Sequence, residues 1–299
     1  MANKLILSTV LFLLTSVPVF SEDDTEIKPL DKKLHLKCLY PTVRVDGKLF
    51  VNNKLIPNAE VHGTGVVLSS KKIGDIYWNT AITASHVVND NPFNLGNCKV
   101  EMKFTISLAV YKDWSTFVKY ETYPIHVYKV DDKFDLAILV FRTPRKLHTA
   151  DIDCESKLYI GTEVMRIGCG LGDQPRLDYG IITSLNPTFH SVKDKGRARL
   201  SLHTVPGDSG GGVFYNYKLK GIISCIRMMG QFPIFTICYM SKINNLPVWN
   251  KFQNNRLDFV YKGTKLPSIA RCRMWFREQD VNKDFIHSKK YAIPKRKFQ

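Results

Sequence analysis

Apolar and polar positions alternate in short runs along most of this chain, a spacing typical of β-strands. The runs are rich in valine, isoleucine, threonine and aromatic residues, and glycine, asparagine, aspartate and proline separate them. In the first half the pattern predicts strands over 61–68, 79–84, 99–111, 117–130 and 135–142. In the second half it predicts strands over 163–168, 179–185, 197–203, 211–215, 218–226 and 233–240. Helical periodicity is scarce before residue 243, so the pattern favours an all-β fold, either a barrel or a sandwich.

The amino-terminal segment has a different character from the rest of the chain. Residues 1–21 carry one lysine, then a mostly apolar run, then small residues that precede an acidic stretch. This order predicts a secretory signal peptide, and hence a secreted or periplasmic protein. An uncleaved membrane anchor is the alternative, but the run from Leu5 to Phe20 is short for a membrane span. A polar leader over 22–37 follows it, and no later stretch is apolar enough to cross a membrane.

The carboxyl-terminal part is predicted to be a helix followed by a basic extension. The helix covers about 243–258, with Pro247 in its first turn. Residues 259–299 form the extension, whose last part, 271–299, holds nine basic and three acidic side chains. The whole chain has a formal net charge of +16. The basic residues of the tail indicate a solvated segment, and weak contact of the tail with a polyanion is the alternative.

The seven cysteines give no sign of a metal site. None belongs to a C-x-x-C pair, and no cysteine–histidine group has zinc spacing, so we expect neither a metal nor another cofactor. An exported chain permits disulfides. Because seven is odd, at least one thiol is free or pairs with another chain.

The stretch PGDSGGGVF, 206–214, places one serine in a backbone made unusually free by glycine. A nucleophilic serine must project from a sharp turn, beside N–H groups that hold a developing oxyanion, and glycine permits the strained dihedral angles of such a turn. Ser209 is therefore a candidate nucleophile, and the N–H groups of Gly207 and Ser209 form a candidate oxyanion hole.

A serine nucleophile needs a base, and the base needs a carboxylate that orients it. His86 ends the apolar stretch ITASH among small residues that let other groups approach. Asp135 stands at the start of the apolar strand DLAILVF, where a half-buried carboxylate can hold an imidazole in one tautomer. The chain order is His86, Asp135, Ser209.

These residues lie in motifs that resemble those of the trypsin-like, chymotrypsin-fold serine proteases. The matching segments, in the order of that family, are GTGVVLSS (63–70), TASH (83–86), DLAIL (135–139) and GDSGG (207–211), and GIIS (221–224) resembles the strand that pairs with substrate backbone. The resemblance implies two six-stranded antiparallel β-barrels that meet at a cleft. It also implies an exported serine endopeptidase that cleaves protein or peptide substrates through an acyl-enzyme, without a cofactor.

The resemblance also suggests domain boundaries and a branch of the family. The protease domain covers 38–258, with barrel one over about 38–145 and barrel two over about 155–242. Several segments are more similar to bacterial-type and high-temperature-requirement-type members than to digestive enzymes. In relatives activated by cleavage, a new terminal amine pairs with the aspartate that matches Asp208. No IVGG-like sequence precedes the first barrel, so Asp208 needs another partner.

The residues of the primary specificity pocket are assigned by the same resemblance. His203 lies six positions before Ser209, at the base of the pocket in digestive members, and Thr204 follows it. Ser224 and Ile226 would line the walls. No aspartate is present, so preference for arginine or lysine is not expected. His203 either donates to glutamate or glutamine side chains or turns into the barrel.

Two other functions remain open. The first alternative is a protease homologue that has lost turnover and works as a binding module. The presence of all three triad residues argues against it. The second alternative is a structural or adhesive protein that binds polyanions through its basic tail. Labelling by a fluorophosphonate distinguishes the enzyme from the first alternative, and hydrolysis distinguishes it from the second.

Overall fold

The computed structural model describes residues 32–88, 93–95, 98–112, 116–153, 156–189, 192–193, 196–229, 231–243, 260–261 and 264–265. The chain divides into two compact units, Met1–Asp31 and Lys32–Gln299, and every described residue belongs to the second. Most of the predicted terminal features lie outside the described residues. These are the signal peptide 1–21, the leader up to 31, the helix beyond Ile243 and nearly all of the extension 259–299.

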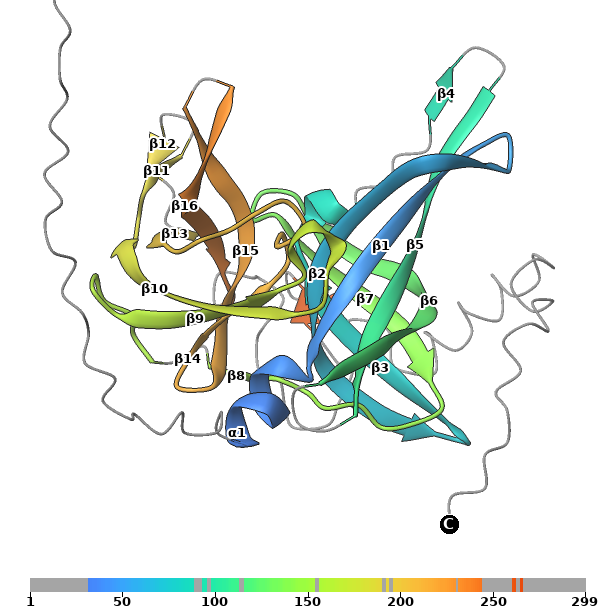
Figure 1. The fold of residues 1–299 in the computed structure, drawn as a ribbon, viewed down its shortest axis with the longest axis horizontal. Helices are drawn as coiled ribbons and strands as arrows, with labels where there is room; N and C mark the ends of the chain where they lie inside the picture. Colours follow the sequence, from blue (N-terminus) through green and yellow to red (C-terminus); the bar gives the residue numbers. More distant parts are fainter. Residues whose placement is uncertain are drawn as a thin grey trace, which may run out of the picture. The chain divides into compact units, whose positions relative to one another are not determined.

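Barrel one is a ring of six antiparallel strands in the first half of the chain (Figure 1). The strands, in ring order, are β1 (Thr42–Val51), β2 (Lys54–Ile73), β3 (Ile76–Thr83), β7 (Leu136–Thr143), β6 (Phe117–Asp131) and β5 (Cys98–Tyr111). Pairing of β1 with β5 closes the ring, and the short β4 (Phe93–Leu95) adds to the outer side of β5.

Barrel two repeats this design in the second half. Its ring consists of β14 (Gly212–Tyr215), β9 (Glu163–Gly168), β10 (Arg176–Ser184), β13 (Arg197–Ser201), β16 (Phe232–Lys242) and β15 (Lys218–Met229). Pairing of β14 with β15 closes this ring, and β8 (Asp151–Ile152) joins β15 in parallel. Small two-stranded pairs complete the described strands: β11 (Thr188–Phe189) with β12 (Val192–Lys193), and β17 (Val260–Tyr261) with β18 (Thr264–Lys265). The predicted double-barrel fold is confirmed.

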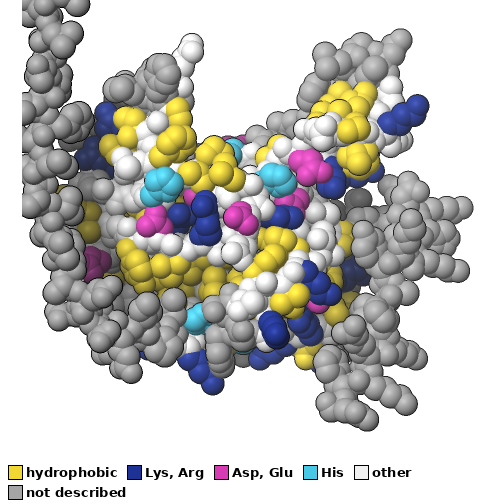
Figure 2. All heavy atoms as spheres, viewed as in Figure 1, with side chains coloured by type: hydrophobic (Ala, Val, Ile, Leu, Met, Phe, Trp, Pro, Cys, Tyr) yellow, Lys and Arg dark blue, Asp and Glu magenta, His cyan; other side chains and the backbone are white. Residues whose placement is uncertain are grey.

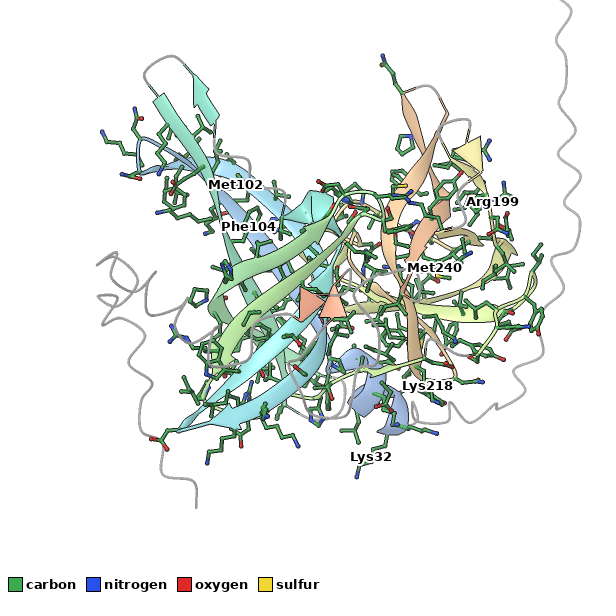
Figure 3. All side chains as sticks on the ribbon, turned by 180° about the vertical axis from the view of Figure 1, so that it is seen from behind. Lys32, Met102, Phe104, Arg199, Lys218 and Met240 are labelled. Atoms are coloured by element: carbon green, nitrogen blue, oxygen red, sulfur yellow. The ribbon has the colours of Figure 1, made fainter. Side chains whose placement is uncertain are left out.

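The strand pattern did not predict β1, and the reason lies at one glycine. The dipeptide Asp46-Gly47 is a turn signal, yet Gly47 lies within β1 opposite Phe104 of β5. A Cβ atom on Gly47 would approach the Phe104 ring to 2.6 Å and the end of Met102 to 3.0 Å. Both side chains belong to the same extended part of β5 (Figure 3). Cross-strand packing, rather than a turn, therefore explains this glycine.

Several strands are also longer than predicted. β2 begins at Lys54 rather than 61, and β15 and β16 run past the barrel as an extended hairpin (Figure 1). The first seven residues of β2 are exposed or half-buried in a run without alternation. Hydrophobic periodicity cannot reveal a strand whose two faces both meet water.

A short helical segment precedes barrel one. It comprises α1 (Lys32–Leu34) and the wider turn His35–Leu39, and it buries Leu34 and Cys38 against the core. The second compact unit begins at Lys32, and the boundary of the protease domain at 38 stays a prediction.

The buried apolar side chains form three clusters. One fills barrel one, with Val45, Ile106 and Leu139 as members, and another fills barrel two, where Met240 is fully buried (Figure 3). The third contains residues of both rings, including Ile82 of β3 and Ile167 of β9. Because this shared cluster packs the rings against each other, side chains at their junction keep a fixed geometry.

Charged side chains on the face shown in Figure 2 are scattered among apolar and uncharged ones, without a continuous basic patch. Among the described residues, none of the helices has the length and apolar character required to span a bilayer.

Candidate active site

Two neighbouring strands of barrel one bring His86 and Asp135 together. Strand β3 pairs with β7 so that Thr83 lies opposite Ala137. His86 lies in the 3₁₀ turn η2 (Ser85–Val87) just after β3, and Asp135 lies just before β7. Antiparallel pairing therefore places the end of one strand beside the start of the other. The separation along the sequence is large, but the register makes the two residues neighbours.

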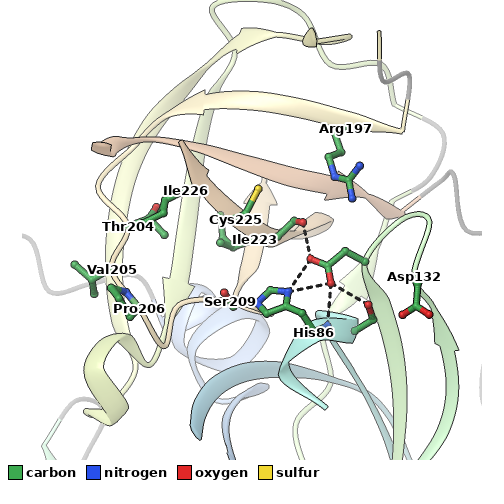
Figure 4. A pocket seen from close by; sticks show the side chains of 13 residues that line it. His86, Asp132, Arg197, Thr204, Val205, Pro206, Ser209, Ile223, Cys225 and Ile226 are labelled. Atoms are coloured by element: carbon green, nitrogen blue, oxygen red, sulfur yellow. Dashed lines mark hydrogen bonds and ion pairs between the residues drawn. The ribbon is translucent and has the colours of Figure 1, made fainter. Parts of the chain in front are cut away.

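The Asp135 carboxylate accepts hydrogen bonds from four donors (Figure 4). The His86 ring donates from Nδ1 at 2.9 Å, and the His86 backbone N–H donates at 3.0 Å. The hydroxyl of Ser85 donates at 3.0 Å and that of Ser224, from β15, at 2.5 Å. Asp135 itself adopts φ +53°, a left-handed conformation that aspartate tolerates better than most residues. The carboxylate is thus held from both barrels.

This environment decides the charge of Asp135 and the tautomer of His86. Burial acts to raise the pKa of Asp135, but the hydrogen bond and charge of His86 and the Ser224 hydroxyl hold the pKa below its ordinary value of 3.8. An ionised carboxylate beside Nδ1 keeps the ring proton on that nitrogen. Nε2 is then the unprotonated nitrogen, and the half-exposed ring can accept a proton there.

Ser209 lies beside His86 in the same cavity, at the end of a loop that only glycine can build (Figure 4). Gly207 has φ +95° and Gly210 has φ +86°. A Cβ atom on Gly210 would lie 1.9 Å from the carbonyl oxygen of Thr64. Within the described chain the Ser209 hydroxyl forms no hydrogen bond with the His86 ring. Such bonds are often long without substrate and shorten in the reacting complex.

The backbone of this loop leaves two donors available. Neither Gly207 N–H nor Ser209 N–H donates a hydrogen bond to another described residue. The carbonyl of Pro206 accepts from Leu171 N–H at 2.6 Å, which turns the next N–H, that of Gly207, in the opposite direction. The turn that contains Leu171 is held in place by barrel one, since Arg44 donates to Gly172 O at 2.6 Å. The predicted oxyanion donors are therefore unengaged among the described residues, and the peptide plane that carries Gly207 N–H is held by Leu171.

Asp208, between these donors, forms an ion pair with Arg166 of β9. Their side chains are 0% and 3% exposed. Val205 N–H also donates to Asp208 at 2.9 Å. Burial raises the pKa of Asp208, and the Arg166 charge and the Val205 N–H act against that rise. A Cβ atom on Gly168 would lie 2.6 Å from the Asp208 carboxylate, so glycine there makes room for the buried pair.

His86, Asp135 and Ser209 line one cavity of about 590 Å³. Of the predicted pocket residues, Thr204, Ser224 and Ile226 line it together with His86 and Ser209. His203 is not part of this lining: it is exposed, with its ring centroid 6.4 Å from that of Phe235. Exposure of the ring does not fit burial of His203 in the barrel, and contact of His203 with the substrate stays a prediction. Ser224, expected as a wall, also donates to Asp135.

Several residues at the site were not singled out from the sequence. Arg166 is the partner that Asp208 was expected to need, and the only hint was an arginine within the apolar strand EVMRIG. The cavity is also lined by Ser85, Asp132, Arg197, Val205, Pro206, Ile223 and Cys225. In Figure 4, Arg197 and Asp132 lie on the opposite side of His86 from Thr204 and Val205. Ser85, Pro206 and Ile223 lie within motifs quoted above, whereas no local motif marks Asp132, Arg197 or Cys225.

The cysteines described with their side chains carry free thiols. They are Cys38, Cys169, Cys225 and Cys238. Burial raises the pKa of Cys169 to about 12 and that of Cys225 to about 11. Thiols with such pKa values are poor nucleophiles at neutral pH, so Ser209 has no competing thiolate beside it in the cavity.

Comparison with known proteins agrees with this geometry. The serine protease PepD of Mycobacterium tuberculosis (strain ATCC 25618 / H37Rv) is 28% identical over 123 residues, which cover 38% of this chain. The match spans only 26% of that relative's length. Residues 63–219 match the family model of the trypsin-like peptidase domain, and this segment includes His86, Asp135 and Ser209. Since the segment is more than half of the 299 residues, the chain belongs to the trypsin-like peptidase family.

Proposed function

We propose that this protein is a serine endopeptidase in which Ser209 is the nucleophile, His86 the base and Asp135 the orienting carboxylate. The observation that carries the proposal is the combination of the Asp135–His86 bond with Ser209 around one cavity, in a loop whose Gly207 and Ser209 N–H groups donate to no other described residue. Each of these groups has a role in acyl transfer, and together they are the complete set that this chemistry needs.

In the first step Ser209 Oγ attacks the scissile carbonyl carbon, and His86 Nε2 takes the hydroxyl proton. The carbonyl oxygen becomes an oxyanion, which accepts hydrogen bonds from Gly207 N–H and Ser209 N–H. Asp135 stabilises the resulting imidazolium through Nδ1 without taking the proton itself. His86 then protonates the leaving amine, the C–N bond breaks, and an acyl-enzyme on Ser209 remains.

In the second step water replaces the amine. His86 takes a proton from the water, whose oxygen attacks the ester carbonyl through a second oxyanion. Collapse of that intermediate returns the proton to Ser209 Oγ and releases the carboxylic acid. No cofactor takes part in this sequence.

A fluorophosphonate probe and a peptide substrate test the proposal on the purified protein. We expect covalent labelling at Ser209 and hydrolysis, and we expect S209A to lose both. Labelling and hydrolysis that are absent from the folded wild-type protein would overturn the enzyme assignment and favour a homologue that only binds. Hydrolysis that survives in S209A would assign the nucleophile elsewhere.

For specificity, we propose that Thr204, Ser224 and Ile226 contact the substrate side chain that precedes the scissile bond. The support is that they line the cavity with Ser209 and carry no charge. We therefore expect uncharged side chains to be preferred there over arginine and lysine. Cleavage of a peptide library shows the preference directly, and strong selection for arginine would contradict this assignment.

The proposed organisation is a signal peptide over 1–21, a leader over 22–37, a protease domain over 38–258 and a basic extension over 259–299. We propose export, to a secreted or periplasmic location, because of the apolar start of the sequence. Sequencing of the amino terminus of the mature protein tests this, with cleavage expected after about residue 21. Retention on heparin that disappears on deletion of 271–299 tests the polyanion contact.

A further inference from the structure

Thr64 of β2 lies where the two barrels meet behind the nucleophile, and its side chain belongs to a buried hydrogen-bond chain. The hydroxyl donates to the carbonyl of Gly207 at 2.7 Å. The same oxygen accepts from the backbone N–H of Cys169 at 2.7 Å. Thr64 is fully buried, so no water competes with these bonds.

The backbone of Thr64 is joined to the same region. Its N–H donates to the carbonyl of Ser209 at 2.7 Å, and its own carbonyl accepts from the Thr83 hydroxyl at 2.5 Å. Strand β2 of barrel one is thus bonded on one side to the nucleophile loop of barrel two and on the other to strand β3, which leads to His86. One residue therefore connects the nucleophile with the element that carries the base.

The two bonds around Gly207 fix its two peptide planes separately. Leu171 N–H holds the carbonyl of Pro206, before Gly207, and the Thr64 hydroxyl holds the carbonyl of Gly207 itself. Between them Gly207 has φ +95°, which a glycine can leave at little cost. The plane that the Thr64 hydroxyl holds, Gly207–Asp208, lies between the two planes that carry the N–H groups of Gly207 and Ser209. Without the hydroxyl this middle plane would lose its side-chain anchor, and the orientation of the two N–H groups relative to each other would vary.

We propose that the Thr64 hydroxyl is a positioning group that keeps the N–H groups of Gly207 and Ser209 aligned as an oxyanion hole. This inference rests on the proposed function for its catalytic consequence. Thr64 touches no reacting atom, so its effect is expected on the transition state and not on substrate binding.

The test compares T64V with T64S. Valine has nearly the volume of threonine but no hydroxyl, whereas serine keeps the hydroxyl and loses a methyl group. For T64V we expect kcat to fall about 10- to 100-fold with KM changed by less than about threefold. For T64S we expect kcat within about threefold of wild type, because the bond to Gly207 persists.

T80V is the matched control. Thr80 is also fully buried in barrel one, and its hydroxyl is bonded to that of Ser69 at 2.7 Å rather than to the nucleophile loop. The same chemical change there should alter the melting temperature without changing kcat. Equal losses of kcat in T64V and T80V would show that removal of a buried hydroxyl elsewhere in barrel one has the same effect. That result would overturn the inference.

Amide hydrogen exchange gives a readout that does not need activity. We expect faster exchange at Cys169, Val205 and Asp208, whose N–H groups donate hydrogen bonds here, in T64V than in wild type or T64S. If the wild-type protein neither hydrolyses peptides nor reacts with the probe, the proposed function fails, and the exchange rates still decide whether Thr64 orders the loop. Unchanged exchange in T64V would contradict the positioning role even in an active enzyme.

Discussion

The guanidinium of Arg166 and the carboxylate of Asp208 form a buried ion pair directly behind Ser209. Arg166 comes from the middle of β9, so the pair is complete without a chain terminus. In relatives activated by cleavage, a newly formed amine supplies the positive charge for the matching aspartate. Here a side chain supplies it, and we infer that ordering of the nucleophile loop does not depend on a newly cut terminus.

Replacement of Arg166 should strongly destabilise the folded protein. In R166M the Asp208 carboxylate stays buried without its cation, and we expect the free energy of unfolding to fall by about 3–5 kcal/mol. Urea denaturation measures this. The double variant R166M/D208N removes the buried charge as well and should recover part of the loss. A single variant that loses less than about 1 kcal/mol would show that the pair is not required.

The tautomer of His86 should depend on Asp135. In D135N the amide can donate to Nδ1 and thereby favour the proton on Nε2, the nitrogen that must accept it. We expect kcat to fall roughly 10⁴-fold while the fold remains. Steady-state hydrolysis measures this, and D75N, in the exposed turn between β2 and β3, is the control that should stay active. Near-normal kcat in D135N would remove Asp135 from the mechanism.

His126 of β6 should make stability depend on pH. Burial lowers its pKa from 6.5 to about 4 in the folded protein. As pH falls from 6.5 to 4, the unfolded chain takes up a proton that the folded protein does not, so this contribution to stability, present above pH 6.5, is lost toward pH 4. Unfolding curves of wild type and H126L should therefore diverge on acidification, with wild type losing more. If the free energies of unfolding of wild type and H126L changed equally with pH, His126 would not be the cause of the pH dependence.

Gly210 should not tolerate a side chain. In G210A the new Cβ meets the Thr64 carbonyl at a positive φ, so the loop must shift, and we expect a loss of roughly 2–4 kcal/mol together with hydrolysis. Chemical denaturation and a peptide assay measure the two losses. In G74A, where φ is +65° and no atom lies within 4 Å, only the strain applies and hydrolysis should persist. Full activity in G210A would mean that the loop has other workable conformations.

The fold was predictable because local motifs mark it, and the three proposed catalytic residues lie in the same motifs. GDSGG needs its glycines for the turn itself, and TASH and DLAIL lie at the ends of β3 and β7, whose antiparallel pairing brings them together. These signals are short and contiguous. Within β9 the match to the predicted range 163–168 is complete, since the strand is apolar and bounded by turns.

Other features could not be predicted because they depend on contacts across the fold. Nothing adjacent to Arg166 marks it as the partner of Asp208, and nothing adjacent to Ser224 marks its bond to Asp135. His203 was assigned by its distance from Ser209 along the sequence, but the loop turns its ring toward Phe235. Position along a chain does not determine side-chain direction when the intervening backbone is irregular.

The division of the site between two rings has a consequence for biosynthesis. A growing polypeptide releases His86 and Asp135 from the ribosome well before Ser209, and the strand that carries Ser224 follows later still. Under the proposed mechanism, an unfinished chain therefore holds a base without a nucleophile. Its capacity to hydrolyse peptide bonds then arises only when translation has delivered the second ring.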